Sequence, residues 1–171
     1  MATTYEPIAT TTLGSAAASI TFSSIPATYT DLKLVTVAQA DTFDGYVGYD
    51  IQFNSDTGSN YSLTRLVGNG TTAVSARISN ATQLNIGGAV ATSTTSSNFA
   101  LSEIDIFNYS GSTYKTLLSG LSGDTNGAGQ VRRVVGLWRS TSAITSVYLF
   151  ADSGFNFKTG TTATLYGIKN A

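Results

Sequence analysis

The chain of 171 residues contains no cysteine and no histidine, and only 11% of its residues are charged. Without cysteine no disulfide can form, and without histidine the chain lacks the usual general base and the commonest metal ligand. Globular proteins usually carry about a quarter of charged residues, more than twice the fraction found here. The 21 serines and 27 threonines therefore supply most of the polar groups as hydroxyls.

The charge and the short apolar runs each argue against one class of function. The formal net charge is −1, and the nine basic residues include a single adjacent pair, Arg132 and Arg133. Nucleic-acid binding needs clustered lysine and arginine to displace counterions, so it is not expected. The apolar runs are only a few residues long, which excludes a transmembrane helix. The opening residues 1–14 lack the basic and apolar regions of a secretory signal, so we expect synthesis in the cytoplasm.

Threonine, valine, isoleucine, tyrosine and phenylalanine are abundant, whereas glutamate, lysine, methionine and glutamine are scarce. β-Branched and aromatic residues suit a pleated, half-buried surface. Short alternating segments recur between turns rich in glycine and asparagine, which indicates a sandwich or barrel. We expect residues 1–171 to form one all-β domain of about nine to eleven antiparallel strands without substantial helix.

The segments expected to form strands are 5–13, 19–22, 31–37, 46–53, 61–67, 74–78, 84–86, 99–107, 114–121, 130–139, 144–151 and 161–168. The segment 74–78 is weaker than the others, and 84–86 is expected to end at the pair Gly87 and Gly88. Residues 91–97 are a low-complexity run predicted to be a surface loop.

No arrangement of residues predicts catalysis. A serine–lysine mechanism would need an activated serine, and no motif supports one. Glu103 and Asp105 share one face of a predicted strand, about 6 to 7 Å apart, as paired carboxylates of a glycosidase could. A polar patch on an exposed face or at a subunit contact is the favoured interpretation. Residues 124–127 begin like a calcium loop but lack its further ligands, and a turn is predicted instead. We expect no enzyme, no cofactor and no metal site.

One cluster combines arginine with an aromatic ring. Trp138 lies beside Arg139 and near Arg132 and Arg133, and such residues are favoured as interface anchors. The same cluster could be a sugar-stacking platform, or a core tryptophan with solvated arginines. The candidate interface residues are Tyr5, Arg132, Arg133, Trp138 and Arg139. A surface with few charges avoids the desolvation cost of burying them, so it suits extensive protein contact.

Several phrases of the sequence are similar to those of one group of phage proteins. The most distinctive is IPATYTDLKLV (residues 25–35), and the others are NYSLTRLVGNGT (60–71), SEIDIFNYSGSTYKTL (102–117), GLWRSTSAITSVYL (136–149) and ATLYGIKNA (163–171). Together with the opening strand, they make nearly the whole chain resemble the small virion structural proteins found in aquatic bacteriophages.

The resemblance implies a jelly-roll-like β-sandwich on the virion surface, without catalytic residues. Two placements remain open: a capsid decoration (cement) protein, commonly a homotrimer, that binds the major capsid protein or other virion proteins, and a tail-fibre or baseplate component that attaches to carbohydrate on the host. The length favours decoration, because no heptad or collagen-like stalk is present. Neither nucleic acid nor membrane is expected as a partner.

Overall fold

The computed structural model describes residues 4–42, 45–91, 98–126 and 128–169. Within this part of the chain there are twelve β-strands, and the only helical element is a 3-10 turn, Asp152–Gly154. The strands are β1 (Tyr5–Thr12), β2 (Ser19–Phe22), β3 (Asp31–Ala40), β4 (Tyr46–Phe53), β5 (Tyr61–Gly68), β6 (Ala73–Ala81), β7 (Leu84–Ala91), β8 (Ala100–Phe107), β9 (Lys115–Gly123), β10 (Gln130–Trp138), β11 (Val147–Ala151) and β12 (Thr162–Ile168).

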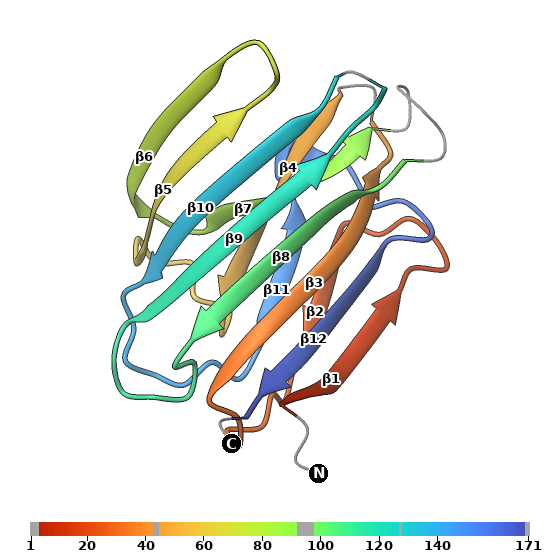
Figure 1. Ribbon diagram of the computed structural model, residues 1–171. Helices are drawn as coiled ribbons and strands as arrows, with labels where there is room; N and C mark the ends of the chain where they lie inside the picture. The colour runs from red at the N-terminus through yellow and green to blue at the C-terminus, as the bar shows by residue number, and fades with distance from the viewer. Residues whose placement is uncertain (1–3, 43–44, 92–97, 127, 170–171) are drawn as a thin grey trace.

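Hydrogen bonds join the twelve strands into one large, open sheet that is antiparallel except at one place. Eight strands form what we call the eight-stranded layer, in the order β1-β12-β3-β8-β9-β10-β5-β6. The other four follow the order β2-β11-β4-β7 and connect to it through a short parallel pairing at Gln39–Val90 and Ala40–Ala91. Figure 1 shows these four strands behind the eight-stranded layer.

The alternation of side chains decides which face of the eight-stranded layer is buried. Leu32 and Leu34 of β3 are buried, as are Ile104 and Ile106 of β8, whereas Val37 on the other face of β3 is exposed. The buried face meets β7, which lies against β8 and β9. Burying each such leucine or isoleucine contributes about 1.5–3 kcal/mol, so this inner core holds the two groups of strands together.

A tyrosine and a leucine explain why β7 contains two consecutive glycines: Gly87 lies against Tyr49, and a Cβ atom at Gly88 would lie 2.5 Å from Cδ1 of Leu121. The ring of Tyr49 is fully buried, and its hydroxyl is hydrogen-bonded to the Thr36 hydroxyl. A Cβ atom at Gly87 would lie 1.9 Å from Cζ of Tyr49, so only glycine leaves room for this ring. The expected end of the strand at Gly87 and Gly88 is therefore wrong, because these glycines continue the strand under the ring.

A second aromatic cluster packs in the core beside the turn between β4 and β5. The indole of Trp138 is stacked on the ring of Tyr61, with centroids 6.3 Å apart, and lies 5.5 Å from the ring of Phe53. Its Nε1 donates a hydrogen bond of 2.7 Å to Oδ2 of Asp56, in the β4–β5 turn. Burial raises the pKa of Tyr61 to about 12. These contacts tie the end of β10 to the turn between β4 and β5, two strands that belong to different groups of the sheet and do not pair with each other.

The all-β class is confirmed, but three details differ from the sequence-based expectation. There are twelve strands in the described residues rather than about nine to eleven, and the weak segment 74–78 is a nine-residue edge strand. Strand β11 begins at Val147 rather than residue 144, because the backbone N–H groups of Thr145 and Ser146 are hydrogen-bonded to the side chain of Asn54. The run 91–97 lies outside the described residues except for Ala91, which ends β7.

In the described ranges, the structure has no helix with the length and hydrophobicity needed to span a bilayer.

Candidate protein-contact face

The face of the eight-stranded layer that points away from the four other strands is unusually apolar, and we call it the outer face. Residues that pair directly across antiparallel strands share one face, so the register identifies its members. Val131 pairs with Ser122, Ser122 with Leu101, and Leu101 with Val37. The exposed large apolar side chains that the register places here are Tyr5, Val37, Leu66, Leu101, Phe107, Val131 and Val135.

The exposure of these side chains is high for residues of their kind. Val131 is 63% exposed and Leu66 is 55% exposed. Single exposed apolar residues are common on monomers, but a contiguous group of them marks a contact site. The outer face is therefore the surface of this molecule that is best suited to cover another protein surface.

A shallow hollow of about 410 Å³ lies near the middle of the outer face. The residue row that crosses it runs Leu66, Arg133, Gly120, Glu103 and Val35 on five successive strands. Gly120 has no side chain, and Nη1 of Arg133 lies over it, 2.8 Å from where a Cβ atom would stand. The hollow thus has apolar walls, a cation on one side and the carboxylate of Glu103 on the other.

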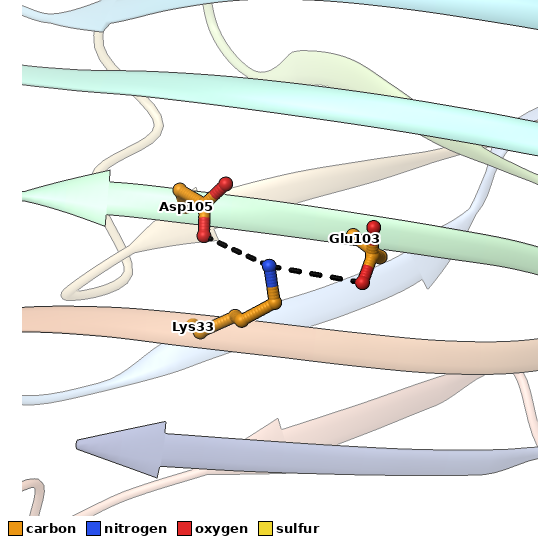
Figure 2. Close-up of polar contacts among 3 residues, drawn as sticks. All are labelled: Lys33, Glu103 and Asp105. Carbon is orange, nitrogen blue, oxygen red and sulfur yellow. Dashed lines mark hydrogen bonds and ion pairs between the residues drawn. The ribbon is translucent and has the colours of Figure 1, made fainter. Parts of the chain in front are cut away.

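The two carboxylates singled out in the sequence do lie on this face, as the favoured interpretation predicts. Nζ of Lys33, on the neighbouring strand β3, is 3.1 Å from Asp105 and 3.7 Å from Glu103 (Figure 2). Burial alone would lower the pKa of Lys33, but its hydrogen bond to Asp105 and the charges of both carboxylates raise it. The lysine occupies the space between the carboxylates, so they form an ion cluster rather than an open acid–base pair.

The five candidate interface residues are divided between the two faces and one end of the sheet. Tyr5 is 53% exposed and lies on the outer face, opposite Ile168, and Arg133 lies on the same face. Arg139 is exposed at the end of β10, where its guanidinium donates hydrogen bonds to the Ser59 carbonyl and the Asn80 side chain. The structure therefore brings Tyr5 and Arg133 to one surface but does not bring the whole set together.

Trp138 and Arg132 point inward. Trp138 is 2% exposed, so its expected exposure is wrong and the alternative of a core tryptophan holds. Arg132 shares its parity on β10 and is half-buried, so it is not a fully solvated arginine either. The physical reason is the strict alternation along β10, which turns every second residue from 132 to 138 toward the core. No local pattern marks Val131 and Leu66 as exposed, because apolar residues occur on both faces of their strands.

Arg132 belongs to a polar relay at the edge of the core. Its Nη1 donates a 2.7 Å hydrogen bond to Oδ1 of Asn85, and Nδ2 of Asn85 donates one of 2.9 Å to Oδ1 of Asp50. Nε2 of Gln83 donates to the other carboxylate oxygen of Asp50. Asp50 is 3% exposed and borders a second hollow of about 360 Å³, which Asp152 and Asn80 also line.

Asp50 makes the stability of the fold dependent on pH. Burial raises its pKa above the ordinary value of 3.8, and the charge of Asp152 adds to this, while the hydrogen bonds from Asn85 and Gln83 oppose it. The folded protein therefore holds this proton to a higher pH than the unfolded chain. Stability must fall as the pH rises from about 4 through the folded-state pKa, and level off above it.

We expect Asp50→Asn to remove this fall. In urea unfolding at pH steps between about 4 and 7, the difference in unfolding free energy between the variant and the native chain should shift in favour of the variant as the pH rises. Asp41 and Asp56 have lowered pKa values, and the stability that they contribute is lost only as the pH falls below about 3.8. A difference that stays constant across this range would contradict the assignment.

The described residues contain no group of three or more histidine, cysteine, aspartate or glutamate side chains that could hold a metal ion. No protein-family model, no curated protein and no solved structure matches the chain.

Proposed function

We propose that this chain is a structural protein of a bacteriophage particle, and that it acts by non-covalent contact on the surface of the head as a decoration protein. The observation that carries the proposal is the outer face, where exposed apolar side chains surround an ion cluster of one lysine and two carboxylates on a continuous sheet. The resemblance of the sequence phrases to small virion proteins is the reason for placing the protein on a phage particle. We propose that its partners are the major capsid protein or other virion proteins.

We also propose that the two groups of strands form a jelly-roll-like sandwich. The support is the shared core, in which buried residues of β4, β7 and β11 contact buried residues of the eight-stranded layer. A sheet supported on its inner side by such a core is rigid, and a rigid contact surface loses little conformational entropy when it binds. A protein that binds only assembled heads stabilises them in proportion to its occupancy.

The position of the gene and a binding assay test this function together. We expect the gene to lie beside that of the major capsid protein, and the purified protein to sediment with heads of the phage that encodes it. Val131→Lys should weaken that binding at least about tenfold, because it places a charge among the exposed apolar side chains of the outer face. Thr57→Lys, in the exposed β4–β5 turn, adds the same charge elsewhere and should bind normally. Failure of the native protein to bind heads would overturn the proposal.

An adhesin of the tail that binds host-surface carbohydrate is the second candidate. The hollow beside Asp50 favours it, because the side chains of Asn80, Gln83 and Asn85 line it with amide groups that can hydrogen-bond sugar hydroxyls. A glycan array separates the candidates. Saturable binding to one glycan, lost in Gln83→Ala, would support the adhesin, whereas binding to heads with an empty array supports decoration.

A further inference from the structure

The charges and apolar groups of the outer face are arranged so that the face complements itself. β9 runs between β10 and β8, and Gly120 of β9 pairs with Arg133 on one side and with Glu103 on the other. We propose that two copies of the chain pack outer face to outer face, about a two-fold axis that is parallel to β9 and passes over Gly120. The inference rests on the proposed function and deepens it: in the free protein a second copy covers the outer face, and binding to a head exchanges that copy for the capsid surface.

A two-fold axis of this orientation exchanges the two sides of β9 between the copies. Arg133 then faces Glu103 of the second copy, and the same contact occurs a second time by symmetry. In the adjoining row, Val131 faces Leu101 of the second copy, because both pair with Ser122. Opposite charges and apolar side chains thus meet their complements in these two rows without any change of register, whereas in the next row Val135 faces Asp105 of the second copy, because both pair with Leu118.

The middle of the face leaves room for this contact. Gly120 and Ser122 lie under the axis and have small or no side chains, and both line the hollow of about 410 Å³. The guanidinium of Arg133 already extends over Gly120 toward the axis, and none of the described residues accepts a hydrogen bond from it. A carboxylate from the second copy would supply that acceptor.

The net charge of the contact area also favours a second copy. Lys33 and Arg133 carry two positive charges, and Glu103 and Asp105 carry two negative charges, so each face is neutral and does not repel its copy. Five strands about 4.8 Å apart and four side-chain rows about 6.8 Å apart give a projected area of about 600 Å². A stable interface takes about 800 Å² of accessible surface from each partner, which side-chain relief on such an area can approach.

Charge exchange tests the symmetry directly. Sedimentation velocity of the native protein over a range of concentrations should show a dimer. Arg133→Glu alone places two pairs of like charges in contact, as does Glu103→Arg alone, and each should raise the dimer dissociation constant about 100-fold. Mixing the two single variants should restore a dimer that contains one copy of each, because both contacts are then attractive.

Lys169→Glu is the control, since it makes the same change of charge on a residue that the register places off the outer face, beside Glu6. It should leave the dimer intact. Restoration on mixing cannot come from refolding, because each variant alone is first shown to be folded by circular dichroism and monomeric by sedimentation. A native monomer, a trimer unaffected by either variant, or a mixture that stays dissociated would each overturn the two-fold contact. A monomer that still binds heads would refute this inference alone, and a dimer that binds neither heads nor glycans would refute the proposed function alone.

Discussion

Replacing Trp138 with alanine is expected to lower the free energy of unfolding by about 3–5 kcal/mol, which is a large part of the stability of a domain of this size. The indole is buried between Tyr61 and Phe53, and its removal leaves a cavity that the rigid ends of two strands cannot close. The substitution also removes the donor to the Asp56 carboxylate. Urea unfolding followed by circular dichroism measures the effect.

Trp138→Phe separates the two contributions, since it keeps most of the ring contact and removes only the hydrogen bond. We expect it to cost about 1.5–3 kcal/mol, because the bond has a charged acceptor. It should also raise the pKa of Asp56. Burial alone would raise that pKa, but hydrogen bonds from Trp138, Asn60 and the Gly58 N–H hold it below its ordinary value. A cost below about 1 kcal/mol for the alanine variant would show that the cluster is not packed as described.

Gly87→Ala is expected to destabilise the fold by about 3 kcal/mol, which is at the upper end for an overpacked core. The added methyl group would lie 1.9 Å from Cζ of Tyr49, and that ring cannot move away because Phe157 lies edge-on to it, with centroids 5.6 Å apart. Strand propensity alone would favour alanine over glycine, so the substitution is destabilising only because of the collision with the Tyr49 ring. The midpoint of thermal or urea unfolding measures this loss of stability.

Gly14→Ala is the matched control, since a Cβ atom there would have no neighbour within 4 Å. It should leave the stability unchanged or raise it slightly, by reducing the freedom of the unfolded chain. Combining Gly87→Ala with Tyr49→Leu tests the cause, because the smaller side chain removes the collision. The double variant should lose clearly less stability than the sum of the single variants, and simple additivity would contradict the explanation.

Much of the fold could be predicted from local patterns, because a strand with one buried face shows its period in the sequence. The segments 19–22 and 46–53 form strands with the expected bounds. Glu103 and Asp105 also share one face of β8, as predicted, and the structure buries Ile104 and Ile106 on the other face. In β8 the chain covers only one side of the strand, so buried and exposed residues alternate along it.

Burial by distant segments could not be predicted in the same way. Asp50 and Gln52 alternate with Tyr49, Ile51 and Phe53 and have the pattern of a solvated face. They are buried nevertheless, because the turn after β6 covers them and supplies partners: Gln52 donates to the Thr82 carbonyl, and Gln83 donates to Asp50. Nothing in the local sequence of β4 encodes a cover that comes from 30 residues away.

The candidate site depends on register, which also lies outside local patterns. Glu103 and Asp105 could be placed on one face from their spacing, but Lys33 is paired with Asp105 across 72 residues of chain. The apolar members of the outer face were missed for a related reason. Valine and leucine on both sides of a strand predict a central strand equally well, whether the second face is covered by this chain or by another molecule.

The place of β3 in the sheet has a consequence for the order of folding. Its two long antiparallel neighbours are β8 and β12, which begin only at Ala100 and Thr162, whereas β3 ends at Ala40. During synthesis, β3 therefore leaves the ribosome with both edges unpaired, and its hydrogen bonds to β12 must wait until nearly all of the chain has emerged. Pairings of such long sequence separation are slow to form, and open edges are prone to join other chains in the interval. We expect refolding on the timescale of milliseconds to seconds, with yields that fall as the protein concentration rises.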